Sequence, residues 1–207
     1  MKRFPSFSGS LLIFPITLFL VFVSIPGCVP KSPSLSSLDQ GAAQTNSEVI
    51  QVVVKPVITS GFQSEDEEKW GVDLSAYFTT FEVKIINKTS EEIAFDPDRA
   101  RLYQGEESVF PVLNGKEAVQ YYMTGSGEPV FTIFPKSKAI VEAETKKILE
   151  ARMEGGIIAP GEKKEGLIFF KKISPRQCKE LVLKLSVAVT GSGETKEFSF
   201  PFSCGEP

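Results

Sequence analysis

The strongest structural signal in this chain is a pair of segments near its C-terminus, LVLKLSVAV (residues 181–189) and EFSFPF (residues 197–202). Large apolar side chains occupy every second position in both segments, and this period of two is the pattern of a β-strand with one buried face. The Gly-Ser-Gly sequence at residues 191–193 lies between them and suits a hairpin turn. A turn there sets Leu185 opposite Phe198 and Leu183 opposite Phe200, so two apolar rows share one face of a sheet.

Similar short runs, rich in Val, Ile and Phe, recur upstream between clusters of Gly, Pro, Asn and Asp. Residues 77–87 alternate most clearly. The run over residues 49–58 contains Pro56, which lacks an amide hydrogen and favours a sheet edge or a bulge. About nine strands are expected, the others lying near residues 93–95, 99–103, 108–113, 130–134 and 166–173. This pattern predicts a mainly β fold, an immunoglobulin-like β-sandwich over residues 49–207, with a small open barrel or an α+β sheet as alternatives.

One inserted helix is expected, over residues 137–154. Ser137 is a suitable N-cap, the interior is rich in Ala, Glu, Lys and Leu, and Gly155-Gly156 would end the helix. Its apolar residues cover about half of the circumference: Ile140, Val141, Ile148 and Leu149. We therefore expect a surface helix that lies on the β-structure.

The N-terminal residues have the pattern of an export signal. Lys2 and Arg3 precede an apolar run over residues 11–25, which is followed by Pro26, Gly27 and Cys28. A basic start, an apolar segment and small residues at the end are typical of a signal peptide. The ending resembles the bacterial lipoprotein signal, in which a Cys after a small residue receives diacylglycerol. The resemblance implies a signal peptide over residues 1–27 and lipidation of Cys28, with palmitate among the acyl chains.

Two other interpretations of this segment remain open at the level of sequence. One is an uncleaved membrane anchor, because the apolar run and its flanks approach the roughly 20 residues of a membrane-spanning helix. The other is ordinary cleavage beside an unmodified Cys28.

A lipidated Cys28 would place the protein at a membrane of the bacterial cell envelope. Val29 stands where the lipoprotein pattern has an Asp for inner-membrane retention, so outer-membrane delivery is expected if the organism has two membranes. Residues 28–48 are rich in Ser, Pro, Gln and Ala and offer few large apolar side chains. Such a composition predicts a flexible tether between the anchor and the domain.

Composition disfavours several classes of function. The chain has 23 basic and 26 acidic side chains, an acidic balance that disfavours nucleic acid as a partner. Histidine is absent, which removes the commonest general base, the usual zinc ligand and any Ser-His or Cys-His pair. We therefore expect a protein that is not an enzyme and that holds no metal or cofactor.

Two cysteines remain when Cys28 is acylated. In an exported domain an even number of thiols is normally paired. The hairpin register sets Cys204 opposite Lys179, one residue from Cys178, and an irregular strand entry can close that offset. We predict a disulfide between Cys178 and Cys204, the alternative being two free thiols.

Three aromatic residues lie outside the clean strand alternation: Trp70, Tyr121 and Tyr122. Exposed rings of this kind form rigid, partly polar platforms for a saccharide or a peptide. They are candidates for a binding surface, and the alternative is that they fold back onto the core.

Five segments together resemble a family: FEVKIINKT (residues 81–89), ARL (100–102), VFP (109–111), IAPGE (158–162) and GLIFF (166–170). They are similar to the telokin-like, immunoglobulin-type domains of uncharacterised bacterial lipoproteins. The resemblance covers residues 49–202 and implies an exported, non-catalytic module.

The expected function is that of a lipid-anchored envelope lipoprotein that acts as an interaction or structural module, in contact with a membrane and an envelope protein complex. One alternative is a saccharide- or peptide-binding envelope protein. Another is a hydrolase that works without His, through Ser and Lys or paired carboxylates.

Overall fold

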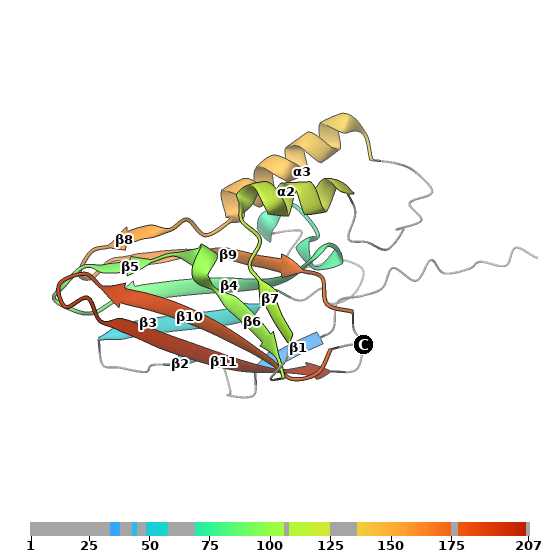
Figure 1. The fold of residues 1–207 in the computed structure, drawn as a ribbon. Helices are drawn as coiled ribbons and strands as arrows, with labels where there is room; N and C mark the ends of the chain where they lie inside the picture. Colours follow the sequence, from blue (N-terminus) through green and yellow to red (C-terminus); the bar gives the residue numbers. More distant parts are fainter. Residues whose placement is uncertain are drawn as a thin grey trace, which may run out of the picture.

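The computed structural model describes residues 34–37, 43–44, 49–57, 69–105, 108–124, 136–174 and 178–205. In these ranges the chain forms two antiparallel β-sheets packed face to face, with two helices beside them (Figure 1). The predicted mainly β sandwich is confirmed. The predicted signal peptide and Cys28 lie outside the described residues. No helix within the described ranges is long and apolar enough to span a membrane.

The smaller sheet has the order β2-β3-β4-β9. Its strands are β2 (Ala43–Gln44), β3 (Ile50–Pro56), β4 (Phe78–Asn87) and β9 (Lys163–Lys171). In β4 the side chains of Phe81, Val83 and Ile85 are fully buried, as the alternation predicted. Pro56 is the last residue of β3, beyond the two residues that pair with β2. At that position its missing amide hydrogen leaves the centre of the sheet intact.

The larger sheet has the order β1-β11-β10-β5-β8, and β6 and β7 extend it beside β10. The strands of this sheet are β1 (Ser34–Ser37), β5 (Ile93–Phe95), β6 (Arg101–Gln104), β7 (Ser108–Pro111), β8 (Gly156–Ile158), β10 (Leu181–Val189) and β11 (Thr195–Gly205). β5 pairs with the end of β10 and β6 with its start. The short 3-10 helix η2 (Pro97–Arg99) lies between them in the chain, where Asp96 caps it and Asp98 lies in its first turn.

β3, β4 and β9 lie side by side in the smaller sheet, and β5, β10 and β11 lie side by side in the larger one. The hairpin β6–β7 and both helices are inserted between β5 and β8. The register of β10 and β11 is the predicted one, with Leu185 opposite Phe198 and Leu183 opposite Phe200.

The predicted tether over residues 28–48 is wrong in part, because two of its segments are strands of the sandwich. β1 pairs with β11 over Ser34–Ser37, and β2 pairs with β3. Leu35 is only 5% exposed and belongs to the sandwich core. The polar composition of this segment did not indicate strands. A strand at a sheet edge is held by backbone hydrogen bonds, which any residue except proline can donate. The folded domain therefore begins before residue 49.

The sandwich core lies between the two sheets and is built from aliphatic and phenylalanine side chains. Its largest fully buried members include Phe81, Phe95, Phe170, Phe198 and Phe202. Phe81 links the sheets, since its ring centre lies 4.9 Å from that of Phe202 and 6.0 Å from that of Phe170. Contacts at these distances add the favourable geometry of paired rings to the burial of apolar surface.

Two complete α-helices lie in the described residues, where one was predicted, and Lys69 and Trp70 are also helical. The additional helix, α2 (Gly115–Thr124), covers the segment with Tyr121 and Tyr122 that sequence reasoning left irregular. It begins with a capping box: the amide of Glu117 donates to Asn114 Oδ1 at 3.0 Å, and the amide of Asn114 donates to Glu117 Oε2 at 2.9 Å. The Asn-x-x-Glu spacing was the signal that could have revealed it.

The predicted helix is α3 (Lys138–Ala151). Ser137 caps it as expected, accepting a hydrogen bond from the amide of Ile140 at 3.3 Å. The helix ends before Gly155-Gly156, because the chain after Ala151 is extended and the amide of Met153 donates to the carbonyl of Leu167 in β9 at 2.8 Å. Hydrogen bonding to the sheet, and not the glycine pair, therefore ends the helix.

Both helices lie on the outer face of the smaller sheet, above β9 and β4 (Figure 1). There they enclose a second core, which we define by its buried residues: Val57, Val72, Leu74, Phe78, Leu113, Ala118, Tyr122, Ile148, Ala151, Leu167 and Phe169. β9 is shared by both cores, because Ile168 and Phe170 face the sandwich while Leu167 and Phe169 face the helices.

Candidate functional site

The three aromatic residues proposed as a binding surface belong to the second core or its margin. Tyr122 is 6% exposed, with its ring edge-on to Tyr77 at a centroid distance of 4.8 Å. Tyr121 packs beside Phe78, and its hydroxyl accepts a hydrogen bond from the amide of Lys172 at 3.2 Å. Trp70 is partly buried against the same core. Tyr122 is therefore buried, because helix α2 turns its ring toward the second core, whereas Trp70 and Tyr121 are only partly buried.

A polar cluster at the margin of the second core joins the two helices. Tyr122 on α2 donates a hydrogen bond to Glu144 Oε2 on α3. Lys136, just before α3, lies 2.9 Å and 2.7 Å from the two carboxylate oxygens of Glu144. Lys136 Nζ also lies over the rings of Tyr77 and Tyr122, at 5.1 Å and 5.6 Å from their centres. We call these four residues the Lys136 cluster.

The surroundings within the Lys136 cluster raise the pKa of Tyr122 and that of Lys136. Burial raises the pKa of the Tyr122 hydroxyl to about 12, and the hydrogen bond to Glu144 acts in the same direction. Burial by itself lowers the pKa of Lys136, but hydrogen bonds with Glu144, Tyr77 and Tyr122 outweigh it and raise that pKa above its usual value. Burial also raises the pKa of Tyr121, against the opposing hydrogen bond from Lys172.

These shifts indicate a structural cluster rather than an acid-base site. A general base needs a pKa near the working pH, whereas Tyr122 stays protonated and Lys136 stays charged far above neutrality. The carboxylate of Glu144 is engaged by both neighbours. The arrangement fixes the position of α3 against α2, and its cation fills the space over the two tyrosine rings.

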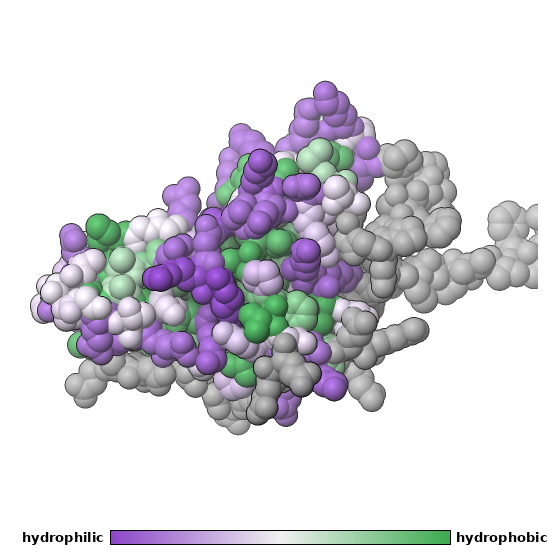
Figure 2. Space-filling view, in the orientation of Figure 1, coloured by the Kyte–Doolittle hydropathy of each residue, from purple (hydrophilic) through white to green (hydrophobic). Residues whose placement is uncertain are grey.

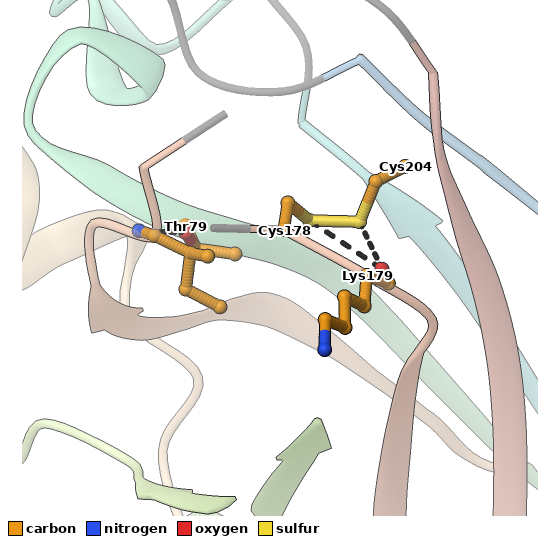
Figure 3. Close-up of a disulfide and its surroundings, with 5 residues drawn as sticks. Thr79, Cys178, Lys179 and Cys204 are labelled. Atoms are coloured by element: carbon orange, nitrogen blue, oxygen red, sulfur yellow. Dashed lines mark hydrogen bonds between the residues drawn. A yellow bond between two sulfur atoms is a disulfide. The ribbon is translucent and has the colours of Figure 1, made fainter. Parts of the chain in front are cut away.

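The structure contains a disulfide between Cys178 and Cys204, with a Cα–Cα distance of 5.9 Å (Figure 3). Cys178 lies just before β10 and Cys204 near the end of β11, so the bridge closes the open end of the hairpin. Both sulfur atoms lie against the carbonyl oxygen of Lys179, at 3.6 Å for Cys178. The hairpin register predicted an offset of one residue between Cys178 and Cys204. The irregular backbone before β10 closes this offset.

A buried asparagine that sequence reasoning did not single out connects several turns at the opposite end of the sandwich. Asn87 is 0% exposed. Its side-chain amide donates to the carbonyls of Glu91 at 2.7 Å and Ile158 at 2.9 Å. Its side-chain oxygen accepts from the amide and the hydroxyl of Thr89, at 2.9 Å and 2.7 Å. The Asn87-Lys88-Thr89 sequence is therefore a turn with every polar atom of the asparagine side chain satisfied.

The described surface carries a few exposed apolar side chains among charged ones. Hydrophobic colour gathers below the helices on the face shown in Figure 2, bordered by hydrophilic residues. The exposed large apolar residues are Val109, Met123, Ile140, Leu149 and Ile157. In the ranges that the structure describes, no three His, Cys, Asp or Glu side chains are grouped so that they could hold a metal ion.

No family model and no curated protein matches the sequence. Among solved structures, the chain is similar to the Bacillus subtilis protein ycdA, provisionally described as a lipoprotein, with 15% identity over 80% of this chain and a TM-score of 0.42. It is also similar to a functionally unknown protein from Listeria monocytogenes EGD-e, with 10% identity over 84% of this chain and 90% of that one and a TM-score of 0.39.

The chain spans about two fifths (39%) of the length of ycdA. At these identities and TM-scores neither similarity identifies a function, and the family resemblance inferred from sequence is not established by them.

Proposed function

We propose that this protein is a lipid-anchored lipoprotein of the bacterial cell envelope whose β-sandwich is a non-catalytic interaction or structural module of the telokin-like type. The observation that carries the proposal is Cys28, directly after a basic start, an apolar run and Gly27. A sandwich with a disulfide supports it, because disulfides persist mainly in exported proteins.

The non-catalytic part of the proposal is supported by what the candidate groups do. The chain has no His. The Lys136 cluster satisfies its own carboxylate, and the Asp96-Pro97-Asp98 sequence forms a capped turn in which Asp98 pairs with Arg152. Partner recognition is then a matter of surface contacts with another envelope protein, and in an organism with two membranes we propose the outer membrane as the site.

The anchor is tested on the full chain, expressed in a bacterium that processes lipoproteins. Intact mass of the membrane-extracted protein is expected to show removal of residues 1–27 and two or three acyl chains, which anchor stably where one binds only marginally. Cys28→Ser is expected to give unprocessed precursor or released protein, with Cys204→Ser as the matched control that keeps the lipid. An unmodified Cys28 in the wild-type protein would overturn the proposal.

The role as a module is tested by mild detergent extraction and co-purification. A stoichiometric envelope protein that co-purifies with the wild type is expected. A protein recovered alone with affinity for a glycan, or a hydrolytic activity lost on changing one Ser, Lys or Asp, would contradict it.

A further inference from the structure

The described part of the chain begins at one defined end of the sandwich. β1 pairs with β11 from Ser34 opposite Gly205 to Ser37 opposite Phe202. Leu35 lies opposite Cys204 and is buried in the sandwich core. β1 is thus held by a ladder of backbone hydrogen bonds and by one apolar side chain, next to the strand that the disulfide ties to the start of β10.

The same end of the molecule includes the start of β4 and the end of β9. Phe78 pairs with Lys171, and the ring of Phe81, in the same strand as Phe78, contacts that of Phe202 in β11. We call this the entry end. The far end carries the turns at residues 88–92, 159–162 and 190–194, which lie together in Figure 1 beyond the opposite ends of β4 and β10. β4 has ten residues, so the two ends are about 30 Å apart.

Only five residues separate Cys28 from Ser34 in the sequence. Fully extended, that stretch spans about 20 Å at most, which is less than the length of the sandwich. A lipid on Cys28 therefore has to lie within that reach of the entry end as long as β1 is paired. The tether of about 20 residues inferred from composition would have allowed the domain any orientation.

We propose that the entry end of the sandwich faces the lipid surface that holds Cys28, and that the far end projects away from it. The inference rests on the proposed anchor and adds the surface that meets the membrane. The pairing of β1 with β11 determines this orientation. It leaves only a short linker between Cys28 and the domain, and that linker joins the domain at one sheet edge.

The experiment measures energy transfer from tryptophan to dansyl-labelled phosphatidylethanolamine in phosphatidylglycerol and phosphatidylcholine vesicles. The chain has one tryptophan, so Trp70→Phe provides a background into which single tryptophans are placed. Two exposed lysines make a matched pair: Lys171→Trp at the entry end and Lys88→Trp at the far end. The mature lipidated protein is reconstituted, and thermal unfolding confirms that each variant is folded.

Strong transfer from position 171 and transfer at background level from position 88 are expected, because transfer falls steeply over the 30 Å between them. Equal transfer from both positions, or stronger transfer from position 88, would overturn the proposed orientation while leaving the anchor intact. Failure of the wild type to float with the vesicles would instead reject the anchor.

A second variant tests whether β1 is responsible. Leu35→Asp places a charge at a buried position and is expected to release β1 from β11, so that the difference between positions 171 and 88 disappears. Leu35→Met keeps an apolar side chain and is expected to preserve the difference. If Leu35→Asp folds and the difference persists, β1 does not orient the domain.

Discussion

The sandwich core and the second core differ in the chemistry of their boundaries. The sandwich core is made of aliphatic and phenylalanine side chains from strands of both sheets. The second core also contains tyrosine and tryptophan, and the hydroxyls of Tyr121 and Tyr122 are hydrogen-bonded to polar groups of lysine and glutamate residues. The two sheets therefore pack through apolar faces. The helices α2 and α3 are also joined by specific hydrogen bonds between polar side chains.

Removing a large side chain from the sandwich core should have the largest effect. Phe81→Ala leaves a cavity between the sheets and is expected to lower the free energy of unfolding by about 3–5 kcal/mol. Chemical denaturation followed by circular dichroism measures it. Met123→Ala, at a position 64% exposed on α2, is the control and should change stability little. Similar losses in both variants would show that Phe81 does not link the sheets.

Removing the disulfide should have the second-largest effect on stability. Cys178 and Cys204 are separated by 26 positions, and closing a loop of that size stabilises the folded state by about 3–4 kcal/mol in the chain-entropy model. The double change Cys178→Ser and Cys204→Ser is expected to lower stability by that amount and to loosen β11 and β1 before the helical layer. Hydrogen exchange at β11 measures the order of opening. Two reactive thiols in the unfolded, unreduced wild type would refute the bridge.

The contact between the two regions can be tested at Gly166 in β9. A Cβ added there would lie 2.6 Å from the Cα of Met153, which is backbone and cannot move aside cheaply. Gly166→Ala is expected to cost about 1–3 kcal/mol through overpacking. Gly115→Ala on α2 is the control, because there the nearest atom is a flexible side-chain carbon of Leu149 at 3.2 Å. If the two changes have the same effect on stability, the close packing of β9 against the backbone of Met153 does not require glycine at position 166.

The smallest effect is expected from the polar margin of the second core. Tyr122→Phe removes the hydroxyl that bonds to Glu144 and should cost about 1 kcal/mol, while Lys136 continues to pair with the carboxylate. The raised pKa of Tyr122 also gives a pH signature. Its folded-state pKa of about 12 lies above the ordinary value of 10.0, so its contribution is fully present below pH 10 and is lost as pH rises through 12.

The wild type should therefore lose stability more steeply than Tyr122→Phe between pH 10 and 12, as measured by denaturation at each pH. If the stability of the two proteins falls equally with pH, Tyr122 does not cause the loss of stability above pH 10. Tyr103→Phe is a suitable control, because Tyr103 lies on β6 and outside both cores.

The features that sequence reasoning anticipated are those with a short repeat or a local cap. The alternation in residues 181–189 and 198–202 predicted both strands and their register, since a shift of one residue would turn every apolar side chain to the wrong face. Ser137 predicted the start of α3 by the same local logic. For the other strands the sequence predicted the fold class but not the strand order, because pairing between distant segments leaves no local pattern in the sequence.

The features that it missed depend on partners far away in the chain. Tyr121 and Tyr122 lie outside the clean strand alternation, and only the packing of α2 on β9 and α3 shows why Tyr122 is buried and Tyr121 partly buried. The strand β1 has an unremarkable composition and exists because β11 offers it an edge. The buried hydrogen bonds of Asn87 form only when folding brings Glu91 and Ile158 to its side chain.

The mainly β class, the hairpin register and the position of α3 could be predicted from the sequence alone, because each follows from a local pattern of side chains. The tertiary structure decided where the domain begins, how its aromatic residues are used and which end of the sandwich the chain enters. Those properties depend on backbone hydrogen bonds and buried polar contacts between segments far apart in sequence, and such contacts exist only when the chain has folded.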